Sequence, residues 1–156
     1  MKKIVFVCHG NICRSPMAEF IFKSMIRERG MEQDFFVESR ATSSEEINGG
    51  EGRPMYPNAR AELDRNGIPY GNKTACQLKR DDLNRYDLFI GMDSANIRNM
   101  HRILDLPEGD PRIRKLMDYS QRGGDVSDPW YSRRFDIAYA DIYEGCAALL
   151  DSLIQN

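Results

Sequence analysis

The chain has 156 residues, of which 41% are hydrophobic and 29% are charged, so its length and composition are those of one globular domain. A chain of this length can bury a core without disulfides or metal ions. Its formal net charge of -2 excludes a broad positive surface for nucleic acid or an anionic membrane, but leaves room for a local positive pocket. We therefore predict a single domain over residues 1–156, a monomer that binds neither nucleic acid nor membranes.

The N-terminal apolar run at residues 4–7 is too short for a signal peptide or a membrane span, which favours a cytoplasmic location. There the four cysteines should stay reduced. They do not form CxxC pairs, which argues against structural zinc, and we predict no metal or other cofactor. Cys76 and Cys146 lie in stretches with helical patterns and should be small buried residues.

The first predicted elements are a strand and the helix that follows it. Residues 4–8 form a continuous apolar run rich in β-branched residues, which is typical of a buried parallel strand. Residues 16–29 show helical periodicity. Ser15 is suited to cap this helix, Pro16 to occupy its first position, and Gly30 to follow its end.

The rest of the chain continues the alternation. Strands are predicted at residues 35–41, 87–92 and 113–117, and helices at residues 56–66, 94–103 and 132–154. This order indicates an α/β fold with a parallel sheet and right-handed crossovers. Two irregular segments, residues 42–54 and 119–131, follow predicted strands, as does the loop after Cys8. Such sheets bind ligands at the carboxyl ends of their strands, so we expect these three loops to form the site.

The loop that leaves the first strand has the sequence Cys8-His9-Gly10-Asn11-Ile12-Cys13-Arg14-Ser15. Such a loop can turn its backbone N–H groups inward to bind an anion, with a helix N-terminus behind it. Gly10 and Asn11 tolerate the positive φ that this requires, and the guanidinium of Arg14 matches phosphate oxygens. Cys8 would then lie in a positive field that favours its thiolate, near the Ser15 hydroxyl. Because the loop lacks GxxxxGK[ST], it is not a nucleotide-binding phosphate loop.

A phenyl phosphate needs a proton on its leaving oxygen, because phenols have a pKa of about 10. Asp128 precedes a Pro-Trp-Tyr segment and follows a glycine-bearing loop, so we predict that it is the general acid. Asp118 and Asp125 are alternatives that lack the following Pro-aromatic pair. Trp130 and Tyr131 are expected to line the substrate cleft.

The Cys-x5-Arg-Ser loop at the start, Asp128-Pro129 and the total length make this sequence similar, from end to end, to the low-molecular-weight protein tyrosine phosphatases. The similarity includes Ser39 after the second strand, and Met92-Asp93 with Asn96 after the third. It implies a four-stranded parallel sheet of order 2-1-3-4 flanked by helices. It also implies metal-independent hydrolysis of phosphotyrosine monoesters, in proteins or small aryl phosphates, through a cysteinyl-phosphate intermediate.

The resemblance assigns roles to residues. Cys8 would be the nucleophile, Arg14 the phosphate clamp, and Asp128 the acid and then the base. Cys13 matches a second loop cysteine that can pair reversibly with the nucleophile, which implies redox sensitivity. Two further groups follow: the residues that hold the loop in shape would be Asn11, Ser15 and Ser39, and the substrate would contact His9, Gly10, Asn11, Ile12, Cys13, Trp130 and Tyr131.

The sequence departs from the family pattern at four places. Lys73 lies about where many members have a histidine, Ile47 near where others have a tryptophan, and Trp130 where relatives have a tyrosine. The loop segment at residues 48–52 is longer than is usual in the family. These departures affect substrate preference and the support of the loop, not the chemistry.

Three polar residues have simple structural explanations, and two rival functions remain. His9 is expected at the surface rim, His101 in solvent, and Asp93 at a helix cap. An arsenate reductase would need further cysteines to relay a disulfide, and Cys76 and Cys146 are far apart in sequence. A phosphate carrier, or a non-catalytic binder of phosphorylated partners, would keep the loop but have no use for an acid.

Overall fold

Strands and helices alternate along the chain in the computed structural model, which describes residues 1–155. The last residue of the predicted domain, Asn156, lies outside the described residues. The elements in chain order are β1 (Lys2–Cys8), α1 (Arg14–Glu28), β2 (Phe35–Ala41), β3 (Ile47–Asn48), β4 (Glu51–Gly52), α2 (Pro57–Arg65), the 3₁₀ helix η1 (Arg80–Asn84), β5 (Leu88–Gly91), α3 (Ser94–Leu104), β6 (Ile113–Lys115), the 3₁₀ helix η2 (Leu116–Asp118), α4 (Pro129–Ser132) and α5 (Phe135–Gln155).

The main sheet has four strands in the order β2-β1-β5-β6, and every pairing in it is parallel. The predicted α/β class and the strand order 2-1-3-4 are therefore confirmed. Ile4 pairs with Val37 of β2 and Leu88 of β5, so β1 lies inside the sheet. Its residues 4–7 are fully buried, as the apolar run predicts.

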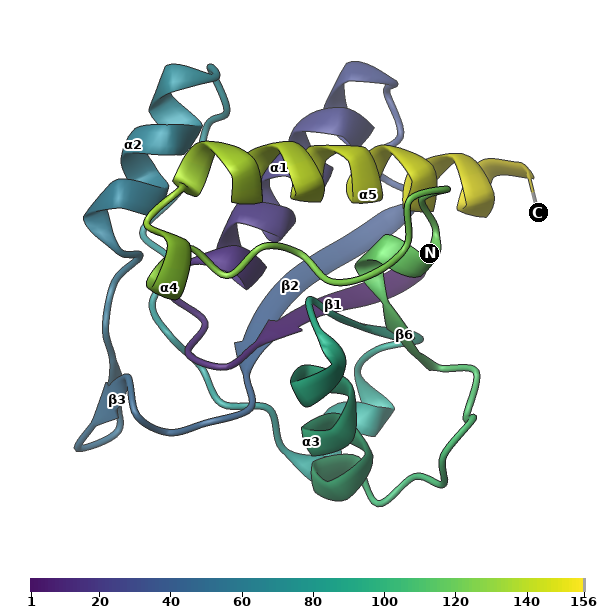
Figure 1. The fold of residues 1–156 in the computed structure, drawn as a ribbon. Coiled ribbons are helices and arrows are strands. Elements are labelled where there is room, and N and C mark those ends of the chain that lie inside the picture. Colours follow the sequence, from purple (N-terminus) through teal and green to yellow (C-terminus); the bar gives the residue numbers. More distant parts are fainter. Residues whose placement is uncertain (156) are drawn as a thin grey trace.

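Helices cover both faces of the sheet (Figure 1): α1, α2 and α5 lie on one side and α3 on the other. Successive side chains of a strand point to opposite faces, and β1 follows this rule. Ile4 and Phe6 belong to the larger apolar cluster beneath α1 and α5, whereas Val5 and Val7 belong to the smaller cluster beneath α3. The chain therefore has two cores separated by one sheet.

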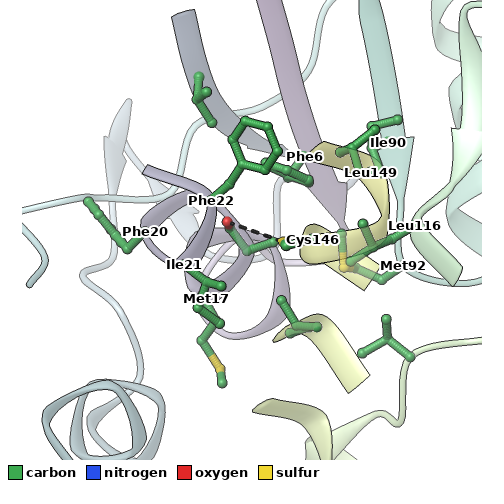
Figure 2. Packing of buried hydrophobic residues seen from close by; sticks show 14 of the residues in the cluster. Phe6, Met17, Phe20, Ile21, Phe22, Ile90, Met92, Leu116, Cys146 and Leu149 are labelled. Atoms are coloured by element: carbon green, nitrogen blue, oxygen red, sulfur yellow. Dashed lines mark hydrogen bonds between the residues drawn. The ribbon is translucent and has the colours of Figure 1, made fainter. Parts of the chain in front are cut away.

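Cys146 lies in the larger core (Figure 2), where it is completely buried among the side chains of α1, α5 and the sheet. Its thiol donates to the carbonyl oxygen of Ala18 across the two helices, at 3.8 Å. The predicted burial of Cys146 is confirmed. The matching prediction for Cys76 is wrong, because Cys76 is exposed in an irregular segment whose backbone pairs with β2 and with Asn11.

Two predicted helix boundaries are also wrong. Helix α1 begins at Arg14, so Ser15 lies inside it and is not its cap, and the hydroxyl of Ser15 is used elsewhere. Pro16 still lies in the first turn, where a backbone N–H has no partner within the helix. The predicted helix at 132–154 is broken at Arg133, whose φ of 63° ends α4, and α5 starts at Phe135.

Two segments differ in detail from the predictions. Residues 42–54 are not wholly irregular, because β3 and β4 form a small antiparallel hairpin there. The strand predicted at 113–117 ends at Lys115, and η2 follows it. Among the helices of residues 1–155, none is both long and apolar enough to span a membrane.

Candidate active site

A pocket of about 470 Å³ opens at the carboxyl edge of the main sheet. Segments that follow all four strands line it: the loop 8–14 after β1, residues 45–46 after β2, residues 93–99 in part after β5, and Asp128, Trp130 and Tyr131 beyond β6. The three loops predicted to form a site do meet here. The lining also brings together most of the predicted site residues, whereas Ser15 and Ser39 lie behind the loop.

The sulfur of Cys8 is the meeting point of several hydrogen bonds. Cys8 is only 4% exposed, and its Sγ accepts the backbone N–H groups of Asn11 at 3.3 Å and Ser15 at 3.4 Å. The Ser15 Oγ lies 3.0 Å from the same sulfur. As a thiol, Cys8 donates to this oxygen; as a thiolate, it would accept from all three groups. Three hydrogen-bonding groups therefore surround the Cys8 sulfur.

Asn11 holds the loop in its curled shape. Its φ of 59° lies in the left-handed region, where Asn is among the few residues that fit easily. Its Nδ2 donates to Ser15 Oγ at 2.8 Å and to Ser39 Oγ at 3.0 Å, and its Oδ1 accepts the backbone N–H of Cys76 at 3.0 Å. Side chain and backbone together therefore fix the loop.

The same network extends to the far side of α1. The Ser39 hydroxyl donates to Glu19 Oε1 at 2.6 Å, and Lys23 donates to Glu19 Oε2 at 2.6 Å. Lys73, at the position of the expected histidine, instead donates to the backbone oxygen of Ser39 at 3.0 Å. Burial lowers the pKa of Lys73, while nearby Glu19 favours its charge. Lys73 therefore contacts β2 at Ser39, the residue whose hydroxyl accepts from Asn11 of the loop.

Arg14 lies at the base of the pocket, 4% exposed. Its NH2 group donates to Asp93 Oδ2 at 2.8 Å and lies 3.6 Å from Asp128 Oδ2, and its NH1 group donates to the Val126 oxygen at 3.0 Å. Burial works against its charge, but Cys8, Asp128 and Asp93 together raise the pKa of Arg14. A permanently charged, oriented guanidinium is therefore fixed beside the sulfur.

Asp93 has two tasks at this edge. Its Oδ1 accepts the N–H of Asn96 at 2.8 Å and caps α3, while its Oδ2 holds Arg14. The predicted cap is confirmed, and the contact with Arg14 is an addition that spacing alone did not indicate.

Asp128 caps the short helix α4. Its Oδ1 accepts the N–H of Trp130 at 3.0 Å, and its Oδ2 faces Arg14. The backbone of α4 therefore holds Oδ1, while Oδ2 is turned toward the pocket and Arg14. The alternatives do not line the pocket: Asp118 is exposed, and Asp125 pairs with Lys115 at 3.0 Å.

Trp130 and Tyr131 form the aromatic part of the wall. Trp130 is 56% exposed and meets the ring of Tyr56 edge to face at 6.2 Å, and Tyr56 in turn stacks on Phe135 at 5.9 Å. Tyr131 is 84% exposed. Trp130 is therefore buttressed by a row of rings, whereas Tyr131 extends into solvent at the rim.

The remaining loop residues line the pocket with different chemistry. His9 lies at the rim, as expected, and its Nε2 is 3.0 Å from Glu45. Gly10 does not adopt the positive φ that we expected; a Cβ there would lie 3.2 Å from Cγ of Glu46, a tight contact that a small shift of this side chain would relieve. Ile12 adds an apolar face. Burial, followed by the charges of Cys8 and Asp128, raises the pKa of Cys13 to about 12, so it stays a thiol at neutral pH.

Sequence reasoning missed part of the wall. Glu45, Glu46 and Asn99 line the pocket, whereas Ile47, the predicted counterpart of a family tryptophan, does not. The signal that could have indicated this wall was the pair of adjacent carboxylates, Glu45 and Glu46, in a loop that follows a predicted strand. His101, expected in solvent, is partly buried, with Nδ1 3.2 Å from the oxygen of Leu106. Within residues 1–155, no three His, Cys, Asp or Glu side chains are grouped as metal ligands.

Comparisons with known proteins agree with this geometry. The family described as low molecular weight phosphotyrosine protein phosphatase matches residues 3–156. The low molecular weight protein-tyrosine-phosphatase YfkJ of Bacillus subtilis is 34% identical over 155 residues, which cover 98% of this chain and 96% of that protein. PtpA of Staphylococcus epidermidis, which bears the same description, is 32% identical over 157 residues, covering 100% of this chain and 96% of the relative.

Solved structures show the same fold. The crystal structure of YfkJ superposes with a TM-score of 0.89 at 34% identity and covers 99% of this chain and 96% of its own. SP-PTP, a low molecular weight protein tyrosine phosphatase from Streptococcus pyogenes, has a TM-score of 0.84 at 38% identity, with coverage of 98% and 93%. The likeness therefore extends over nearly the whole of each chain.

Proposed function

Because the chain belongs to the low-molecular-weight phosphotyrosine protein phosphatase family, we propose that it hydrolyses phosphotyrosine with Cys8 as nucleophile, Arg14 as phosphate clamp and Asp128 as proton donor. The observation that supports this most is the convergence of three features on one pocket: a buried sulfur with three hydrogen-bonding partners, a fixed guanidinium, and a carboxyl oxygen that faces the pocket and Arg14.

The first step transfers the phosphoryl group to sulfur. The Cys8 thiolate attacks phosphorus in line, and the S–P bond forms as the P–O bond to the phenol breaks. Arg14 and backbone N–H groups of the loop stabilise the charge on the equatorial oxygens. Asp128 gives its proton to the departing phenolic oxygen, so the phenol leaves neutral.

The second step returns the enzyme to its starting state. The ionised Asp128 removes a proton from water, and the resulting oxygen attacks phosphorus and displaces the Cys8 thiolate. The products are inorganic phosphate and a protonated Asp128. Arginine and backbone donors supply the electrostatic stabilisation in both steps, so the proposed reaction needs no metal ion.

The test is turnover of p-nitrophenyl phosphate in the presence of a chelator. The parent protein should hydrolyse it, and Cys8→Ser should abolish turnover while keeping the fold and phosphate affinity, because Arg14 and the backbone remain. Cys76→Ser is a matched control, since that thiol is exposed outside the pocket. After acid quench of the parent with radiolabelled substrate, label on Cys13 or a histidine instead of Cys8 would overturn the assignment.

We propose phosphotyrosine as the substrate class because of the walls. Trp130 and Tyr131 offer aromatic faces worth about 0.5–1.5 kcal/mol beyond burial, and Ile12 adds an apolar side. Phosphoserine and phosphothreonine are shorter and would lose these contacts. We expect a preference of at least about 2 kcal/mol, or roughly 30-fold in kcat/KM, on matched peptides. Phosphoarginine should also be poor, since Ile12 cannot accept a hydrogen bond from its guanidinium.

Two rival functions find less support. An arsenate reductase would need cysteines that relay a disulfide to the surface, but Cys146 is completely buried in the core. A non-catalytic phosphate binder would have no use for the carboxyl oxygen that Asp128 turns toward the pocket. A catalytic thiol requires a reducing compartment, which supports our proposal of a cytoplasmic enzyme. We also propose that the enzyme is a monomer.

A further inference from the structure

Two adjacent carboxylates at the mouth of the pocket have no part in the mechanism above. Glu45 and Glu46 lie after β2, directly before the β3–β4 hairpin, and both line the pocket. The Glu45 side chain is 68% exposed and that of Glu46 is 21% exposed. Glu46 also reaches inward, because its charge contributes to the raised pKa of Cys13. The pair therefore extends from the rim to the loop.

The backbone that presents these carboxylates is fixed on both sides. The N–H of Glu45 donates to Ser43 Oγ at 2.9 Å, and the oxygen of Glu46 accepts the N–H of Arg53 at 2.8 Å. Gly52 packs so closely on Ala75 that a Cβ would lie 1.9 Å from the Ala75 oxygen. The hairpin is thus anchored on the segment that also holds Asn11, and it keeps the two carboxylates in place.

The charges at the mouth do not cancel. The lining has two cationic or potentially cationic side chains, Arg14 and His9. Arg14 is already engaged by Asp93 at 2.8 Å and lies near Asp128. His9 faces Glu45 at 3.0 Å. Even with a charge on both Arg14 and His9, the lining holds more carboxylates than cations, namely Glu45, Glu46, Asp93 and Asp128.

Glu46 also pairs with a cationic side chain, Arg53, which does not line the pocket. Arg53 Nε lies 3.6 Å from Glu46, and Arg53 is 61% exposed, so water screens the pair. A substrate's phosphate is held by donors at the base of the pocket, whereas its peptide flanks pass a mouth with surplus negative charge. The flanks therefore meet a different field from the phosphate.

We propose that Glu45 and Glu46 select phosphotyrosine flanked by lysine or arginine. The inference rests on the proposed function and adds the class of substrate to it. Basic flanks would pair with the two carboxylates, and acidic flanks would be repelled. Exposed pairs of this kind are each worth about 1.4-fold to 5-fold. We expect kcat/KM to be about threefold to tenfold higher for a Lys-flanked than for a Glu-flanked peptide at low salt.

The experiment compares three peptides that differ only in the residues on both sides of phosphotyrosine: lysine, alanine or glutamate. Each kcat/KM is divided by the same variant's value for p-nitrophenyl phosphate, which has no flanks. The preference should shrink in 0.5 M salt, because the Debye length, the distance over which charges act, falls from about 10 Å at 0.1 M to about 3 Å at 1 M. Glu45→Gln and Glu46→Gln should each reduce the preference, and the double variant should remove most of it.

Glu51→Gln is the matched control, because Glu51 is an exposed carboxylate on the same hairpin that does not line the pocket. It should keep the full preference. Equal rates on the three peptides, or a preference for glutamate, would overturn the charge selection while p-nitrophenyl phosphate is still hydrolysed. Absence of that hydrolysis would overturn the proposed function instead, so the two failures are distinguishable.

Discussion

At the scale of single residues, the hydrogen-bond network gives the Ser15 hydroxyl a direction. The Nδ2 group of Asn11 can only donate, so Ser15 Oγ must accept from it. While Cys8 is a thiol that donates to Ser15 Oγ, the hydroxyl proton of Ser15 goes to the Arg40 oxygen, at 3.5 Å. A Cys8 thiolate would be a closer and charged acceptor for this proton, at 3.0 Å, and a turn of the hydroxyl hydrogen alone would redirect it.

The role of Asp128 can be tested by varying the leaving group. Asp128→Ala should lower kcat by about 10²–10⁴ for phenyl phosphate, because no group then protonates the phenol. The loss should be smaller for activated esters, whose oxygen leaves without a proton. Asp125→Asn, outside the pocket, should leave both rates unchanged. An equal loss on both esters would instead indicate that Asp128 acts by positioning Arg14, which lies 3.6 Å away.

The raised pKa of Cys13 leads to a prediction about oxidation. Peroxide should convert the Cys8 thiolate to a sulfenic acid, which removes the negative charge that helps to raise the pKa of Cys13. Cys13 should then become more reactive and form a disulfide with Cys8, with release of water. Inactivation should therefore be readily reversed by dithiothreitol in the parent and much less so in Cys13→Ser.

Cys76→Ser serves as the control for this oxidation experiment and should recover like the parent. If dithiothreitol rescues the Cys13→Ser variant equally well, Cys13 has only a packing role.

At the scale of elements, local signals predicted most of the framework. The apolar run of β1 and the Cys-x5-Arg-Ser loop gave the strand, the turn and the following helix. Failures occurred where a distant partner decides the structure. Ser15 resembles a helix cap, but a sulfur seven residues earlier engages its hydroxyl. The sequence around Cys76 has a helical pattern, but the backbone of Cys76 forms hydrogen bonds with Asn11 and with β2 instead.

Other features had no local signal. Arg133 breaks the predicted C-terminal helix at a positive φ without the glycine that usually marks such a break. Glu45 and Glu46 become part of the wall in the folded chain, where the hairpin that follows them packs through Gly52 on Ala75. The chemistry of the pocket base could therefore be predicted, whereas the charge of its mouth required the folded chain.

The packing of α5 on η2 depends on Gly145. A Cβ at this position would lie 2.6 Å from Cγ of Leu116, so the glycine permits the close approach. Alanine normally stabilises a helix interior by about 1 kcal/mol relative to glycine. We nevertheless expect Gly145→Ala to lower the free energy of unfolding by about 1–3 kcal/mol, as overpacking does. Urea unfolding would measure this.

Two further variants test the steric cause. Gly71→Ala should be nearly neutral, because a Cβ there meets no atom within 4 Å. In the double variant Gly145→Ala with Leu116→Ala, the loss should be smaller than the sum of the single losses, since Leu116→Ala makes room for the added methyl group, which in turn fills part of the cavity. Strict additivity would show that the clash with Leu116 is not the cause.

At the scale of the whole molecule, both cores support the site. The larger core under α1 and α5 fixes the helix that follows the Cys8 loop. The strand end that presents Asp93 is held from both sides, by Ile90 and Met92 in the larger core and by Phe89 in the smaller core under α3. The pocket lies where the strand ends from both sides meet. A change deep in either core therefore affects the site by altering the global stability of the sheet.

Alkaline pH should test how firmly the larger core is closed. Burial raises the pKa of Cys146, whereas an unfolded thiol ionises with a pKa of about 8.5. Above that pH the unfolded chain loses a proton that the folded chain retains. The free energy of unfolding should therefore fall with rising pH, with Cys146 contributing about 1.4 kcal/mol per pH unit. Cys13, whose pKa is also raised, contributes in the same direction.

A comparison with Cys146→Ala isolates the contribution of this thiol. At pH 7 the variant should be less stable than the parent, because it loses the buried sulfur and its contact with Ala18. Its stability should then decline less steeply, so the two curves should approach each other between about pH 9 and pH 10.5. Urea unfolding in the presence of a reductant measures both. The difference in free energy of unfolding at neutral pH measures the lost packing. The difference in its slope with pH measures the proton that Cys146 keeps in the folded chain. A constant offset over the whole range would mean that the folded core admits enough water to ionise Cys146.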